Sequence, residues 1–171
     1  MTNKQIILDK KDLLGFILNT EKCTKVKSNL IYDKDNFCFK WDEDNSALNI
    51  PSSSGIYFIL SHNSKRVQKI GKAEGAKGLN QRLKNYTSKK RGEKLDKTAK
   101  LWHEVMTNPK KLKNQGLNIF YYETKPKLVN NPIVEFKKLE ANWARSLEKE
   151  LSKIANQCLN LDIEMLLSGQ N

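Results

Sequence analysis

The sequence has little of what several protein classes depend on. Among its 171 residues are three cysteines, Cys23, Cys38 and Cys158, which are too scattered for a disulfide framework or for paired zinc ligands. No segment approaches the roughly 18 consecutive apolar residues of a membrane span, and the N-terminal residues lack a signal-peptide pattern. We therefore predict a cytoplasmic protein with reduced cysteines and no membrane partner.

Acidic residues are scarce in one segment of the chain. The whole chain has 31 lysines and arginines against 19 acidic residues, a net charge of +12. Residues 1–50 hold eight lysines and eight acids, whereas residues 65–113 hold sixteen basic residues and four acids. Neutralisation of nucleic-acid phosphates requires a basic band of this kind. The alternative is a basic surface that only keeps the protein in solution.

Local patterns predict a mixture of helices and strands. Apolar residues at helical spacing predict helices over residues 6–18, 78–86, 98–106 and 132–156. Runs of β-forming residues predict strands over residues 56–61, 66–71 and 117–124. The first two strands are close enough to form a hairpin.

The chain also has a predicted boundary near residue 50. Residues 36–41 alternate aromatic and other side chains and are interpreted as a strand or an extended arm. Residues 51–55, Pro-Ser-Ser-Ser-Gly, are typical of a break between units. We predict an N-terminal accessory region at residues 1–50, used for DNA contact or dimerisation, and a basic module at residues 51–171.

Short motifs in the basic module resemble a known family. Residues 55–57 are Gly-Ile-Tyr and residues 69–71 are Lys-Ile-Gly, and Arg82 and Tyr86 follow on the next predicted helix. Over residues 53–160 this order resembles the GIY-YIG nuclease superfamily, with lysine where the second motif usually has tyrosine. Some small restriction enzymes of that superfamily are similar at this position. The resemblance implies a small three-stranded antiparallel sheet flanked by helices, in the α/β (α+β) class.

The resemblance also implies roles for these residues. It gives Tyr57 the role of base, or of positioning the attacking water, and gives Arg82 the clamping of the scissile phosphate. Tyr86 would bind the phosphate or pack. A tyrosine with a pKa of about 10 is a weak base at neutral pH, so we expect the Lys69 ammonium to lie near Tyr57 and to lower its pKa.

A glutamate on the last predicted helix would hold one divalent metal ion, Mg²⁺ or in its place Mn²⁺. Glu140 and Glu148 are both candidates, since each precedes an apolar residue by three positions. We prefer Glu140, because a ligand near the start of the helix that follows the third strand should face the hairpin. Glu148 lies two turns, or about 12 Å, further along. One of the two at least is an ordinary helix glutamate.

The expected partner is double-stranded DNA. Basic residues near the arginine helix would neutralise its phosphates; they are Lys72, Lys84, Lys89, Lys90 and Arg91. The sequence has no recognisable zinc finger or helix-turn-helix. This absence favours a compact, site-specific type II restriction endonuclease, which could act as a homodimer. A structure-specific or mobile-element nuclease and a non-catalytic nucleic-acid-binding protein on the same fold remain alternatives. His103 is expected to be a packed or surface residue.

Overall fold

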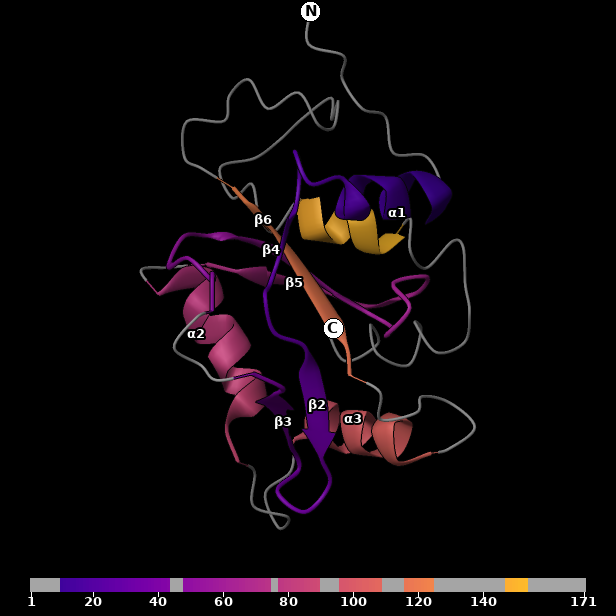
Figure 1. The fold of residues 1–171 in the computed structure, drawn as a ribbon, viewed down its shortest axis with the longest axis vertical. Helices are drawn as coiled ribbons and strands as arrows, with labels where there is room; N and C mark the ends of the chain where they lie inside the picture. The colour runs from indigo at the N-terminus through magenta and orange to yellow at the C-terminus, as the bar shows by residue number, and fades with distance from the viewer. Residues whose placement is uncertain are drawn as a thin grey trace, which may run out of the picture.

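A computed structural model of the chain describes residues 10–43, 48–74, 77–89, 96–108, 116–124 and 147–153. These residues form a mixed α+β structure with one four-stranded sheet, one two-stranded sheet and flanking helices (Figure 1). Among the described residues, no helix has the length and apolar character needed to cross a membrane.

The four-stranded antiparallel sheet is built around the predicted hairpin. Strand β4 (Gly55–Leu60) lies between β5 (Val67–Ala73) and β6 (Asn118–Glu123), and β1 (Thr24–Lys25) pairs with the far side of β6. The expected third strand is therefore present, but the sheet has four strands rather than three. The fourth, β1, has only two residues, and no local pattern distinguishes so short a strand from a turn.

Both faces of this sheet are covered. All six residues of β4 are buried, which explains why the strand is a continuous apolar run rather than an alternating one. On one face, Ile56 and Phe58 pack against helix α1 (Lys10–Leu18) and the helical segment 147–153. These two helical segments lie side by side over the sheet (Figure 1).

The opposite face of the sheet is covered by α2 (Gly78–Lys84), the 3₁₀ turn η2 (Asn85–Thr87) and α3 (Lys97–Thr107). Helix α3 starts at Asp96, whose side chain accepts a hydrogen bond from the Ala99 backbone N–H. A separate hairpin of β2 (Leu30–Asp33) and β3 (Cys38–Trp41) packs beside α3 and η2 (Figure 1).

Residues before position 50 belong to the same core as the basic module. Leu13, Phe16 and Ile17 recur at helical spacing on α1 and are fully buried in one cluster with β4. The β2–β3 hairpin contributes Tyr32 and Phe39 to the cluster on the other face. The predicted boundary near residue 50 is thus not a boundary of the hydrophobic core, and the role of this region in DNA contact or dimerisation stays a prediction.

Candidate active site

The centre of the candidate site is the Tyr57 ring, which lies across Gly71 on the neighbouring strand. The two residues are direct partners in the β4–β5 ladder. A Cβ atom added at Gly71 would stand 2.1 Å from Tyr57 Cζ, so the ring occupies the space that any larger residue would need. This contact gives the glycine of the second motif a packing reason.

Helix α2 brings Arg82 to Tyr57 because its first turn is fixed to the segment before β4. The Leu79 backbone N–H donates to the Ser53 carbonyl, and the Asn80 side chain donates to the Ile50 carbonyl. Gly78 has φ +38°, and a Cβ atom there would stand 2.0 Å from the Ser53 carbonyl oxygen. Only glycine permits both this backbone conformation and this close approach.

Three side chains meet at the Tyr57 hydroxyl. The hydroxyls of Tyr57 and Tyr86 are 2.9 Å apart and share a hydrogen bond, and Arg82 Nε donates to the Tyr57 hydroxyl at 3.4 Å. The two tyrosine rings meet edge to face at 5.9 Å. The hydrogen bonds therefore join the first motif to the helix that carries the arginine.

The acid–base properties of this trio differ from the expectation. Burial raises the pKa of Tyr57, although the Arg82 guanidinium opposes the rise. Burial and the neighbouring Tyr57 hydroxyl raise the pKa of Tyr86 well above its ordinary value. The prediction that Lys69 lowers the pKa of Tyr57 is wrong, because the cation that contacts the Tyr57 hydroxyl is Arg82. Tyr57 is 0% exposed, and its hydroxyl is a neutral hydrogen-bonding group.

Lys69 is the unusual ionisable group of the site. It lies on β5 opposite Ile59, on the same face of the sheet as Tyr57, and only 3% of its surface is exposed. None of the described residues forms a hydrogen bond or ion pair with its ammonium group. Burial and the nearby Arg82 charge lower the pKa of Lys69 to about 8, so this amine changes its charge close to neutral pH.

Glu148, on the helical segment 147–153, lies close enough to Lys69 and Arg82 for their charges to act on its carboxylate. Its neighbours Leu147 and Leu151 are buried in the core under α1, which fixes the helical segment 147–153 in place. The half-buried carboxylate has its pKa raised by burial, while Lys72, Lys69 and Arg82 act in the opposite direction. The three positive side chains near Glu148 would repel a metal ion. The carboxylate could therefore bind a metal ion only when a bound polyanion offsets their charge.

The residues around Glu148 could hold a divalent metal ion only if the substrate supplied some of its ligands. Among the described residues, no group of three or more histidine, cysteine, aspartate or glutamate side chains could hold a metal by itself. Mg²⁺ typically binds proteins through one or two carboxylates, with water and phosphate oxygens completing its shell. Glu148 could supply the carboxylate, and Glu74 is a second acidic group close enough to raise the pKa of Glu148.

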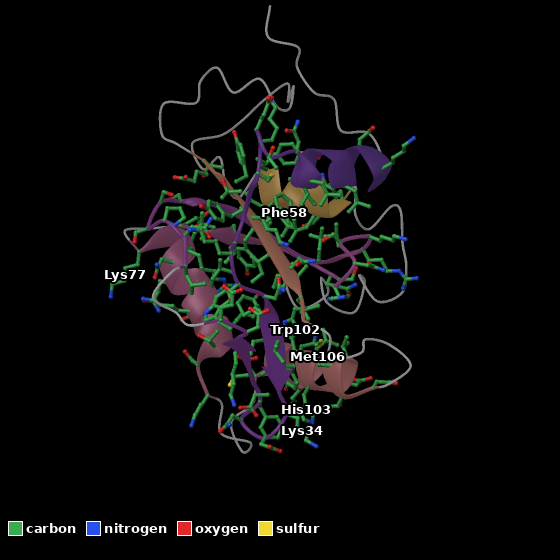
Figure 2. All side chains as sticks on the ribbon, viewed as in Figure 1. Lys34, Phe58, Lys77, Trp102, His103 and Met106 are labelled. Atoms are coloured by element: carbon green, nitrogen blue, oxygen red, sulfur yellow. The ribbon has the colours of Figure 1, made fainter. Side chains whose placement is uncertain are left out.

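A cavity of about 1250 Å³ opens over these residues. Lys69, Arg82, Tyr86 and Glu148 line it, whereas Tyr57 lies behind them. Figure 2 shows Lys77 at the start of α2 and Trp102 on α3, which both line the same cavity. The structure therefore brings together four of the predicted catalytic and metal-binding residues at one surface, with Tyr57 as the support beneath them.

The predicted DNA-contacting residues have different positions. Lys72 lines the cavity and pairs with Glu74 at 3.6 Å. Lys84 and Lys89 are exposed at and beyond the end of α2. Lys90, Arg91 and the preferred metal ligand Glu140 lie outside the described residues, so the choice between Glu140 and Glu148 stays a prediction. The cavity adds one observation in favour of Glu148.

Sequence reasoning missed several residues of the cavity. Ser152 lies four residues after Glu148, so helical spacing from Glu148 would have found it. Phe37 and Phe39 of the β2–β3 hairpin also line the cavity, but nothing local relates them to the motifs of β4 and β5. The expectation for His103 is confirmed, since it is half-buried and its Nδ1 lies 3.0 Å from the Tyr32 hydroxyl.

Comparisons of the chain with protein-family models, with curated proteins and with solved structures find no match.

Proposed function

We propose that the protein is a metal-dependent endonuclease that hydrolyses phosphodiester bonds of double-stranded DNA, on a fold of the GIY-YIG type. The observation that carries the proposal is that side chains from separate elements meet at one cavity. Lys69, Arg82, Tyr86 and Glu148 come from β5, α2, η2 and the segment 147–153, yet all four line one cavity, and Tyr57 of β4 lies behind them with hydrogen bonds to Arg82 and Tyr86. The antiparallel order of β5, β4 and β6 and the arginine on α2 support the resemblance to that superfamily.

Arg82 is assigned the scissile phosphate. Its guanidinium lines the cavity and keeps its charge, because the Tyr57 hydroxyl raises its pKa further. Planar paired donors suit phosphate oxygens, and a fixed cation stabilises the charge that develops on them. Arg82 uses Nε for its hydrogen bond to Tyr57, and none of the described residues bonds to its terminal guanidinium nitrogens, which would contact the substrate.

Glu148 is assigned the metal ion. A bound Mg²⁺, or Mn²⁺ in its place, supplies Lewis acidity that helps the 3′-oxygen to leave. The protein's contribution is a half-buried carboxylate on a helical segment that Leu147 and Leu151 anchor in the core. The neighbouring cations Lys69, Lys72 and Arg82 favour the ionised carboxylate and so oppose the larger rise in its pKa that burial causes.

Lys69 is assigned the proton of the attacking water. A general base works best when its pKa is close to the operating pH, and the Lys69 amine, with a pKa of about 8, meets this condition, whereas the buried phenol of Tyr57 does not. Tyr57 acts through its two hydrogen bonds, which hold Arg82 and Tyr86 in position.

Among the endonucleases, we favour a site-specific restriction enzyme that acts in the cytoplasm, either as a monomer or as a homodimer. The basic side of the cavity suits duplex backbone, and no separate reader module is recognisable in the sequence. A non-catalytic DNA-binding protein on the same fold is the second candidate. It requires the basic cavity but gives no reason for a buried Lys69 beside Arg82 and Glu148 that has no ion-pair partner among the described residues.

The test is cleavage of plasmid and genomic DNA by the purified protein with Mg²⁺ and with EDTA. We expect discrete products only with Mg²⁺, and a loss of about 100- to 1,000-fold in rate for Arg82→Ala and for Glu148→Gln. Glu150→Gln is the matched control, since Glu150 lies on the same helical segment and pairs with Lys153 rather than lining the cavity. Salt-sensitive binding without cleavage would favour the non-catalytic candidate.

The pH dependence of cleavage tests the assignment of the base. If neutral Lys69 accepts the proton, the rate rises with pH and levels off above about 8. Tyr57→Phe should lower the rate but keep this profile. A profile that falls above pH 8 would instead show that Lys69 acts as a cation.

A further inference from the structure

The cavity has two chemically different walls. The wall built from β5, α2, η2 and the segment 147–153 carries six basic and two acidic lining residues. The wall built from the β2–β3 hairpin and α3 carries one acidic lining residue and no basic one. Its members are mostly aromatic or small: Tyr32, Phe37, Cys38, Phe39, Asp96, Thr98, Ala99 and Trp102.

The hairpin turn at the edge of the second wall is held in one conformation. The Asp33 carboxylate accepts hydrogen bonds from the backbone N–H groups of Asp35 and Asn36 and from the Asn36 side chain, and it pairs with Lys40. The next residue, Phe37, has φ +51°. A large side chain in this backbone region is uncommon and costs free energy, so the surrounding contacts must impose it.

Phe37 is also fixed against α3. Its ring packs on the His103 ring with centroids 4.6 Å apart and planes 35° apart, and the Tyr32 hydroxyl bonds to His103 Nδ1 at 3.0 Å. Lys34 of the turn and His103 lie together at the same end of the molecule, away from Lys77 (Figure 2). Phe37 is only half-buried and lines the cavity, so the structure presents part of an aromatic ring that packs on His103 to the cavity.

The charges on the two walls determine how a duplex would lie between them. Phosphates are attracted to the basic wall, whereas the hairpin turn offers no net charge, since Lys34 and Lys40 balance Asp33 and Asp35. With the phosphates held at the basic wall, the aromatic hairpin wall is the one left to face a groove, where aromatic rings contact base edges or methyl groups. A turn that is already rigid loses little entropy when it binds.

From these observations we propose that the β2–β3 turn is the sequence-reading element of this protein and that Phe37 is its base-contacting residue. This inference rests on the proposed function, because it takes double-stranded DNA as the occupant of the cavity. It gives part of the N-terminal region a direct role in specificity, whereas Lys149 and the other lysines of the basic wall contribute affinity for any sequence.

The test is selection of bound duplexes from a randomised pool in EDTA, followed by titration of the selected duplex and a scrambled duplex at several salt concentrations. Phe37→Gly is the main variant, because glycine accepts positive φ and so removes the ring without straining the turn. We expect it to lower the selected-to-scrambled affinity ratio about 10-fold or more and to leave the salt slope unchanged. Thermal unfolding of the variant establishes that it is folded.

Lys149→Ala is the matched variant on the opposite wall. It should weaken binding to both duplexes about equally and reduce the salt slope by about 1. The inference is overturned if folded Phe37→Gly keeps the wild-type ratio, if its salt slope falls instead, or if no consensus emerges from the selection. A Phe37-dependent consensus in a protein that never cleaves DNA supports the inference and refutes the endonuclease proposal, and a wild-type protein that binds no duplex overturns both.

Discussion

The two faces of the central sheet are built from alternate residues of the same strands, but they differ in chemistry. Ile56 and Phe58 face a dry core under α1 and the segment 147–153, and the buried side chains of that cluster are apolar apart from the Tyr122 hydroxyl and the Cys23 thiol. Tyr57, between them in sequence, faces the side where Lys69 and Arg82 line the cavity.

This difference shows how one strand serves both stability and chemistry. The core face can be optimised for packing because it carries none of the assigned site residues on β4 and β5. The opposite face buries Lys69, which forms no ion pair within the part of the chain that the structure describes, and burial of such a charge costs stability. The four substitutions below separate the two faces, from the largest expected effect to the smallest.

Gly71→Ala should damage both the cavity-facing side of the sheet and the stability of the fold. The added methyl group would overlap the Tyr57 ring, and displacement of the ring breaks the hydrogen bonds to Tyr86 and Arg82. Overpacking and two lost hydrogen bonds predict a loss of about 3 to 5 kcal/mol in the free energy of unfolding. Urea unfolding measures it, and a folded, fully active variant would contradict the geometry described here.

Phe58→Ala should affect the core face alone. Phe58 is fully buried and contacts Phe16 edge to face at 6.2 Å. Removal of its ring predicts a loss of about 3 to 5 kcal/mol in the free energy of unfolding. The rate of cleavage per folded molecule should stay unchanged at low temperature, so the ratio of activity to folded fraction is the measurement. A selective loss of that rate would mean that the two faces are coupled.

Lys69→Met should lower the cleavage activity and raise the free energy of unfolding. We expect cleavage to be lost, while the free energy of unfolding at pH 7 rises by about 3 kcal/mol, as the lowered pKa of Lys69 implies. The sign follows from linkage. Between about pH 8 and the ordinary lysine pKa of about 10.4, the unfolded chain binds the proton that the folded protein has lost, so wild-type stability rises with pH.

The stability gain in Lys69→Met should therefore shrink as the pH rises through that window. Chemical unfolding of the wild type and the variant at pH 7 and pH 10 measures this convergence. A constant difference at both pH values would mean that Lys69 has an ordinary pKa, and the assignment of the base would then fall.

Gly15→Ala should have the smallest effect and serves as the reference for Gly71. Gly15 is exposed on α1, and a Cβ atom there meets nothing within 4 Å. Alanine is the better helix former by about 0.8 to 1 kcal/mol, so the variant should be slightly more stable and equally active. Thermal unfolding and the plasmid assay together check this, and any loss of activity would show that α1 communicates with the cavity.

The sequence by itself determined the local elements and most of the candidate residues. The hairpin of β4 and β5, helices α2 and α3 and strand β6 each have a pattern that lies within a few neighbouring residues, and all were predicted within two residues or so of their observed bounds. Helix α1 was predicted over residues 6–18, of which the structure describes Lys10–Leu18 as helical. Side-chain type and motif order were enough to single out Tyr57, Lys69 and Arg82.

Only the tertiary structure decided which of these groups meet and what charge they carry. The partner of Tyr57 is Arg82 rather than Lys69, because α2 is docked by Gly78 and Asn80 onto the segment before β4. The pKa of Lys69 depends on burial by residues remote in sequence. The two-residue strand β1 and the aromatic wall of the β2–β3 hairpin depend on pairing and packing across long stretches of chain, and such contacts leave no periodic trace in the sequence.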